Sequence, residues 1–135
     1  MALILVAEDS PDIATMLRDI LHSKGHQVAV CSDGVEMIER AKSLRPKLIV
    51  SDVMMPGAYG SSAYKSLQDD DFTRGIPILF LTAITPDQAA KVIPKADNVR
   101  VLHKPLMLPV FLNAVNEMLA KAAQQPPIDK KTGPG

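Results

Sequence analysis

Five short apolar runs divide the chain at regular intervals, and each is too short to be a helix on its own. They are Leu3 to Val6, Val28 to Val30, Leu48 to Val50, Ile78 to Leu81 and Val99 to Leu102. Most are continuously apolar, as expected of strands that are buried on both faces of a parallel sheet. Amphipathic segments separate the runs, and parallel strands require such crossovers. The alternation predicts an α/β fold with a doubly wound, five-stranded parallel sheet and five helices in three layers.

The segments between the runs carry the periodicity or the end signals of helices. The first has Ser10 as a candidate cap and one apolar stripe, formed by Ile13, Met16, Leu17, Ile20 and Leu21. Two more helices are expected from Gly34 to Leu44 and near Ser61 to Gln68, the latter with Tyr64 and Leu67 buried. The fourth starts at a Thr85–Gln88 capping box and is cut short by Pro94. The last follows Pro109, with Val110, Ala114, Val115, Met118 and Leu119 on its apolar side.

Composition narrows the class of protein. The formal net charge is zero, from 15 basic and 15 acidic residues, which argues against direct binding to nucleic acid or to an anionic membrane. Cys31 has no second cysteine to pair with, and the apolar stretch Ala2 to Ala7 is too short to span a bilayer. We therefore expect a cytoplasmic domain over residues 1–123. The segment 124–135 is rich in proline and glycine and is predicted to be a flexible tail or a linker.

Polar side chains that could carry chemistry stand one to three residues after four of the five runs. Glu8 and Asp9 follow the first, Asp52 the third, Thr82 the fourth and Lys104 the fifth. Because the carboxyl ends of parallel strands meet at one edge of the sheet, and ligands bind there, these side chains should converge.

The residue types suggest phosphoryl chemistry with a metal ion. Three clustered carboxylates repel one another unless a hard cation such as Mg²⁺ lies between them. A carboxylate can act as a nucleophile and form an acyl phosphate, while an ammonium and a hydroxyl stabilise the phosphoryl oxygens. Each residue also has a simpler interpretation: Glu8 and Asp9 as acids leading into a helix, Asp52 as a turn residue, Lys104 as a surface charge. For the simpler interpretations to hold, all of these residues would have to occur at strand ends by coincidence, which favours the phosphoryl site.

The ordered set of motifs resembles the receiver domains of bacterial response regulators, including the chemotaxis type, over Ala2 to Ala123. The matching residues are Glu8-Asp9, Asp52 with Met55-Pro56 and Gly60, Leu81-Thr82-Ala83, and Lys104-Pro105. The resemblance implies a flavodoxin-like sandwich that serves in two-component signal transduction. It also implies phosphoryl transfer from a sensor histidine kinase or a histidine phosphotransfer protein. The signal would pass to a downstream protein target or to an output domain that this sequence lacks.

The resemblance further implies a role for each residue. Asp52 would accept the phosphoryl group, and Asp9 would bind Mg²⁺ directly. Glu8 would act on the metal through water, and the backbone carbonyl of Met54 would be another ligand. Lys104 would pair with the phosphoryl oxygens, and Thr82 would turn toward them. The peptide bond before Pro105 would be cis.

Three positions depart from the common pattern or should affect how long the phosphate persists. Val101 stands where such domains carry a signalling aromatic residue, so we expect the signal to pass through backbone shifts of the fourth helix and of the strand that carries Val101. Met54 and Ile84 would flank the phosphate without positioning a hydrolytic water, which predicts slow dephosphorylation. The three histidines, His22, His26 and His103, show no ligand spacing and are interpreted as background.

Two other functions are compatible with parts of this pattern. A magnesium-dependent phosphohydrolase would carry a second acid two residues after the nucleophile, where this chain has Met54. A degenerate receiver would be a phosphorylation-independent binding module, but such domains usually lack the acids or the lysine. A receiver domain promotes its own phosphorylation, and we do not expect it to be an enzyme in the ordinary sense.

Overall fold

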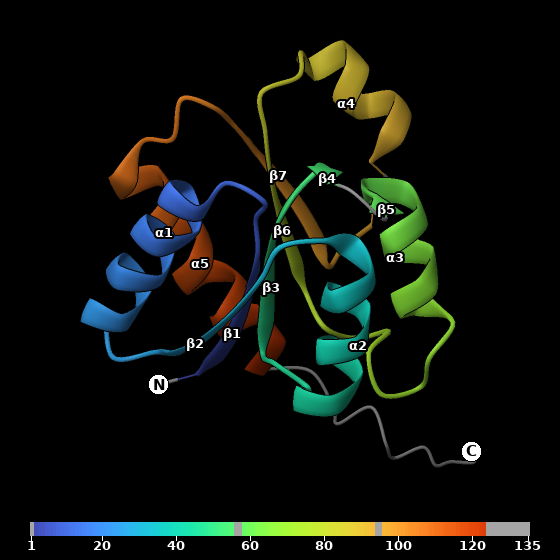
Figure 1. Ribbon diagram of the computed structural model, residues 1–135, viewed down its shortest axis with the longest axis horizontal. Helices are drawn as coiled ribbons and strands as arrows, with labels where there is room; N and C mark the ends of the chain where they lie inside the picture. The colour runs from blue at the N-terminus through green and yellow to red at the C-terminus, as the bar shows by residue number, and fades with distance from the viewer. Residues whose placement is uncertain (1, 56–57, 94–95, 124–135) are drawn as a thin grey trace.

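A computed structural model describes residues 2–55, 58–93 and 96–123, and its centre is one parallel sheet (Figure 1). The sheet has five strands in the order β2-β1-β3-β6-β7, and every pairing is parallel. Their bounds are β1 (Leu3–Ala7), β2 (Gln27–Cys31), β3 (Leu48–Asp52), β6 (Ile78–Thr82) and β7 (Val99–His103). The predicted five-stranded, doubly wound sheet is confirmed.

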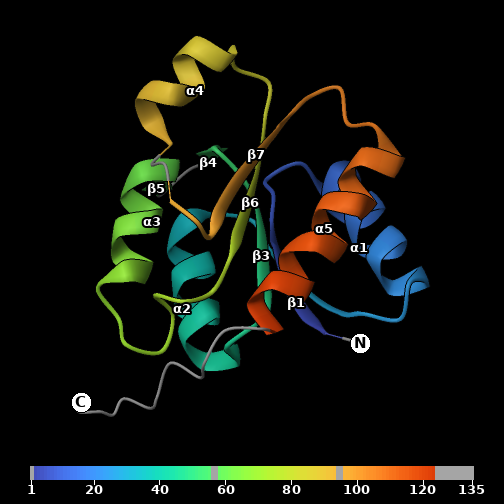
Figure 2. The ribbon, with the colours of Figure 1, turned by 180° about the vertical axis from the view of Figure 1, so that it is seen from behind.

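Helices cover both faces of this sheet, as Figures 1 and 2 show from opposite sides. On one face lie α1 (Pro11–Ser23) and α5 (Leu108–Ala123), and on the other lie α2 (Gly34–Leu44) and α3 (Gly60–Gln68). The short α4 (Pro86–Val92) stands beyond α3, toward the carboxyl ends of the strands. A small antiparallel pair, β4 (Met54–Met55) and β5 (Ala58–Tyr59), leads from β3 into α3.

Two apolar cores lie on the two sides of the sheet. Neighbouring residues of one strand point to opposite cores: Ile4 packs with the α1–α5 side, and Leu5 with the α2–α3 side. This is why the strands are continuously apolar in sequence. Phe111 and Phe80 are the largest fully buried side chains of the two cores, and each contributes about 1.5–3 kcal/mol by burial.

Of the two predicted helix caps, the capping box is confirmed and the Ser10 cap is not, and a third cap was not predicted. Thr85 and Gln88 form the expected capping box at α4, and the Asp33 side chain caps α2 by accepting from the Glu36 N–H at 2.7 Å. Ser10 occupies the cap position of α1, but its side chain makes no capping bond. Its backbone N–H donates instead to Glu8 Oε2 at 3.0 Å, so the residue supports a carboxylate rather than the helix end.

Some predicted core positions are shifted within their helices. In α5, Ala114, Val115 and Met118 are buried as predicted, but Phe111 is buried with them and Val110 is 52% exposed. Phe111 falls at i, i+3, i+4 and i+7 with these three residues and so belongs to the buried stripe, whereas Val110 lies outside that spacing. In α1, Met16 is exposed while Ala14 is buried. In α3, Leu67 is buried as expected, but Ala63 takes the second place and Tyr64 is only half-buried.

Three sequence expectations fall partly or wholly outside the described residues. They concern the break at Pro94, the motif residue Pro56 and the tail 124–135. Among the described residues, none of the helices combines the length and the apolarity needed to cross a membrane.

Candidate functional site

Three carboxylates converge at the carboxyl-terminal edge of the sheet. Glu8 and Asp9 follow β1, Asp52 ends β3, and these two strands are neighbours. One oxygen from each carboxylate lies within 4.8 Å of the others. Glu8 is buried, Asp52 is half-buried and Asp9 is exposed. The cluster is therefore open to solvent on one side and closed on the other, as a site for an exchangeable ion must be.

Lys104 reaches into this cluster from β7. Its Nζ atom lies 3.4 Å from Asp52 Oδ2 and 3.7 Å from Glu8 Oε1. The lysine directly follows β7, which is two strands away from β3, so its long side chain bridges the intervening strand β6. The Lys104–Pro105 peptide bond is cis, as predicted. One ammonium group thus contacts two of the three carboxylates.

The carboxyl group of Glu8 is the most constrained group of the site. It is only 3% exposed, Oε2 accepts the Ser10 N–H, and Oε1 has no hydrogen-bond partner within the described part of the chain. Burial raises the pKa of Glu8 above its ordinary value, and the charge of Asp52 raises it further. The Ser10 N–H and Lys104 act in the opposite direction. A buried, under-coordinated carboxyl oxygen beside two further acids matches the oxygen-rich environment that a divalent cation prefers.

Thr82 lies at the same edge but is fully buried. It ends β6, one residue beyond Leu81, which is the register partner of Asp52. Its hydroxyl oxygen accepts the backbone N–H of Ile84 at 3.1 Å. Its backbone carbonyl accepts the Lys104 N–H at 2.7 Å, which links the end of β6 to the cationic residue of the site.

Met54 follows Asp52 by two residues, in β4. The Val53 N–H between them donates to the Leu81 carbonyl at 3.2 Å and continues the β3–β6 pairing past Asp52. The backbone of Met54 is therefore held close to the end of the sheet. Its predicted role as a carbonyl ligand stays a prediction, and its side chain lies outside the described residues.

The family model for the response regulator receiver domain matches residues 4–116. The chain belongs to the response-regulator receiver family. Protein PilH of Pseudomonas aeruginosa is 34% identical over 122 residues, which are 89% of this chain and 99% of that protein. The polar-differentiation response regulator DivK of Brucella anthropi is 27% identical over 119 residues, covering 88% of this chain and 97% of that protein.

Solved receiver structures share the same fold. The receiver domain of a signal transduction histidine kinase from Syntrophus aciditrophicus superposes with a TM-score of 0.83 at 30% identity, over 93% of this chain and 96% of that one. A receiver domain of a sensor histidine kinase from Pseudomonas aeruginosa gives a TM-score of 0.81 at 25% identity, over 88% and 98%. That structure holds a magnesium ion coordinated in its active-site cleft.

This receiver domain is thus of the two-component type, and its acidic cluster is one that could bind Mg²⁺. The degenerate alternative is not favoured, because the acid pair, Asp52 and Lys104 lie together in one cluster.

Sequence reasoning missed one neighbour of the site. His103, interpreted as background, points its Nδ1 atom at the Ile84 carbonyl at 3.2 Å. The position of His103 at a strand end, directly before Lys104, could have indicated that it lies near the site. Its hydrogen-bond partner could not be predicted, because the partner is a backbone atom in a loop.

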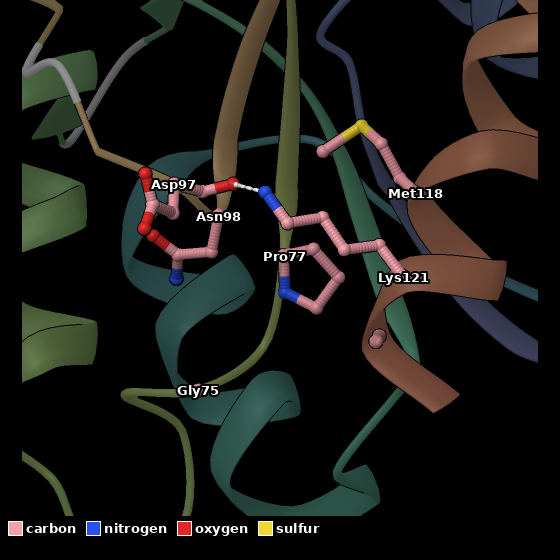
Figure 3. A pocket seen from close by; sticks show the side chains of 7 residues that line it. Gly75, Pro77, Asp97, Asn98, Met118 and Lys121 are labelled. Atoms are coloured by element: carbon pink, nitrogen blue, oxygen red, sulfur yellow. Dashed lines mark hydrogen bonds between the residues drawn. The ribbon is translucent and has the colours of Figure 1, made fainter. Parts of the chain in front are cut away.

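A small hollow lies at the opposite edge of the sheet from the carboxylate cluster, between the starts of β6 and β7 and the end of α5 (Figure 3). Its volume is about 20 Å³, which is room for a single water molecule. Lys121 Nζ donates to the Asp97 carbonyl across it at 3.1 Å. This hollow is too small for a ligand and is not a candidate site.

Proposed function

We propose that Asp52 accepts a phosphoryl group from a phosphohistidine of a sensor kinase or of a histidine phosphotransfer protein. The observation that carries this proposal is the contact of Lys104 Nζ with Asp52 Oδ2 inside a cluster of three carboxylates. Of the two acids in contact with Lys104, Asp52 has the shorter distance, 3.4 Å against 3.7 Å for Glu8, and it also belongs to the group that could hold a metal ion. An incoming phosphoryl group at Asp52 would therefore meet positive charge from the ammonium and from the metal.

Within this proposal, Mg²⁺ would be held by Asp9, Asp52 and the Met54 carbonyl, with Glu8 acting through water. When bound, the metal would neutralise charge on the phosphoryl oxygens. The close approach of the acids supports this fit, as does the buried Glu8 Oε1, which accepts no hydrogen bond from the described residues.

Asp52 is the residue that forms a covalent bond in the proposed transfer. A carboxylate oxygen of Asp52 attacks phosphorus in line with the departing histidine nitrogen. The P–N bond breaks, its electron pair returns to the imidazole, and an acyl phosphate forms on Asp52. Lys104 remains beside the new phosphoryl oxygens, and Thr82 turns its hydroxyl toward them. Positioning and charge stabilisation supply the catalysis.

The output would leave through the face formed by α4, β7 and α5. A groove of about 440 Å³ lies between α4 and β7, close to Thr82, and its lining includes Ala89, Ile93, Val101 and His103. Phosphorylation would shift the population of loop arrangements and so change the affinity of this face for a protein partner. We propose residues 1–123 as the receiver domain that carries both the site and this face, with residues 124–135 as a tail or a linker.

The test is phosphorylation with acetyl phosphate, read by intact-protein mass. Wild type should gain the mass of one phosphoryl group only when Mg²⁺ is present, and Asp52→Asn should gain none. Glu39→Gln removes an exposed carboxylate on α2 and is the matched control, which should be phosphorylated like wild type. A magnesium-dependent adduct of equal amount on Asp52→Asn would refute the assignment.

A further inference from the structure

One residue of the β6–α4 loop is held by two strands at once. The backbone N–H of Ile84 donates to Thr82 Oγ1 at 3.1 Å, and the Ile84 carbonyl lies 3.2 Å from His103 Nδ1. Because a carbonyl oxygen can only accept, the imidazole presents an N–H at Nδ1 in this contact. Thr82 and His103 are register partners at the ends of β6 and β7. The two bonds therefore fix the loop to the end of the sheet at a single point.

Movement of Thr82 would break only the first of these bonds. When its side chain turns, Oγ1 leaves the Ile84 N–H and the loop loses its bond to β6. The bond from His103 to the Ile84 carbonyl does not involve the hydroxyl and continues to hold the loop. The loop is then free to follow Thr82 only after the imidazole has released it. The same loop leads into the Thr85 cap of α4.

We propose that His103 is a positioning residue that holds the β6–α4 loop in its resting arrangement and opposes its movement toward a phosphorylated Asp52. This inference rests on the proposed role of Thr82. The imidazole also lines the groove between α4 and β7. Release of the loop removes the hydrogen bond that joins this ring to Ile84, and so couples the site to that surface.

The size of the effect follows from the bond that is lost. His103 is exposed, so water competes for its hydrogen bond and the net stabilisation is at the lower end of the usual range. Loss of such a bond shifts a two-state population by about two- to fivefold. On this proposal, small phosphoryl donors react with the arrangement in which the loop is turned toward Asp52, and the phosphorylation rate should rise by the same factor.

Two substitutions of His103 separate the effect of losing the hydrogen bond from the effect of losing the size of the ring. His103→Val removes the donor and keeps a residue that suits a strand. His103→Asn keeps a side-chain N–H at about the position of Nδ1. His22→Gln removes an exposed imidazole on α1, away from the loop, and is the matched control. For each protein we would measure amide hydrogen exchange of Ile84 without phosphate and the rate of phosphorylation by acetyl phosphate.

We expect His103→Val to increase both rates about two- to fivefold, and His103→Asn and His22→Gln to resemble wild type. General damage to the site would slow phosphorylation, so a faster rate identifies release of the loop. Unchanged exchange and phosphorylation rates in His103→Val would overturn the proposal. Equal changes of these rates in His103→Val and His103→Asn would also overturn it. If no protein accepted phosphate, the proposed function would fail, while exchange of the Ile84 amide would still decide whether His103 holds the loop.

Discussion

Removal of the buried charge at Glu8 should stabilise the metal-free protein. In Glu8→Gln the side-chain oxygen can keep the bond from the Ser10 N–H, and the new amide group can donate toward the neighbouring carboxylates. The substitution therefore replaces a buried carboxyl oxygen that lacks a hydrogen bond with an amide that can donate toward Asp9 and Asp52, and it removes the attraction of this atom for Lys104 Nζ. We expect Glu8→Gln to unfold at higher denaturant concentration than wild type at pH 7.5 in the presence of a chelator.

The magnitude follows from three contributions. Attraction between Glu8 and Lys104 at 3.7 Å is about 4 kcal/mol at an effective dielectric constant of 20. Repulsion from Asp52 at a separation of up to 4.8 Å is about 3 kcal/mol on the same basis, and the exposed Asp9 adds a smaller repulsion. These charge terms nearly cancel. The remaining cost is the unsatisfied buried oxygen, about 1–3 kcal/mol, so the variant should gain about 1–2 kcal/mol, or about 3–8 °C in Tm.

The gain should depend on pH in a defined direction. Because the pKa of Glu8 is raised in the folded protein, its contribution to stability is complete below its ordinary value of 4.5 and is lost as the pH rises through the raised value. Protonated glutamic acid resembles glutamine, so the advantage of Glu8→Gln should shrink as the pH falls from 7.5 to 5.

Urea unfolding at the two pH values, with and without Mg²⁺, measures these effects. Added Mg²⁺ should reduce the advantage of Glu8→Gln, because the metal relieves the repulsion in wild type. The exposed Glu39→Gln should show no such pattern. A metal-free variant that is less stable than wild type at pH 7.5, or an advantage independent of pH, would refute the reasoning.

Three further predictions concern the helix caps, the cysteine and the phosphate. Asp33→Ala should lower the free energy of unfolding by about 1 kcal/mol. Ser10→Ala should change it by less than half as much, because the Asp33 side chain caps its helix and the Ser10 side chain does not; equal losses in urea unfolding would contradict this. Cys31 is 3% exposed and burial raises its pKa to about 12, so a thiol reagent at pH 8 should label it only after unfolding, and rapid native labelling would be contrary evidence. Phospho-Asp52 should decay over minutes to hours, because Met54 and Ile84 cannot position a hydrolytic water; decay within seconds by intact mass would exclude that.

The sheet and the acidic site could be predicted from the sequence because both follow from where strands end. Glu8, Asp52 and Lys104 are far apart along the chain, but each directly follows or ends a strand of one parallel sheet. Topology then brings them to one edge, and the Lys104–Asp52 contact of 3.4 Å follows the prediction. No knowledge of side-chain packing was required for that step.

Details that depend on competition between neighbours could not be predicted. The burial of Phe111 is not among these details: with Ala114, Val115 and Met118 it falls at i, i+3, i+4 and i+7, and Val110 lies outside that spacing. Ser10 suits a helix cap by type, but its N–H is bound by the Glu8 carboxylate and its side chain makes no capping bond. The contact of His103 with the loop joins a side chain to a backbone carbonyl, and the position of that carbonyl depends on the conformation of the whole loop.

The most direct test of the central claim is chemical mapping of the phosphorylated residue. The protein would be treated with acetyl phosphate and Mg²⁺, and the acyl phosphate would be reduced with borohydride, which converts a phosphorylated aspartate into homoserine. Peptide mass mapping should then find homoserine at position 52 alone, and only in samples that contained Mg²⁺. Homoserine at position 9 in place of position 52, or a phosphorylated protein with no reducible acyl phosphate, would contradict the account.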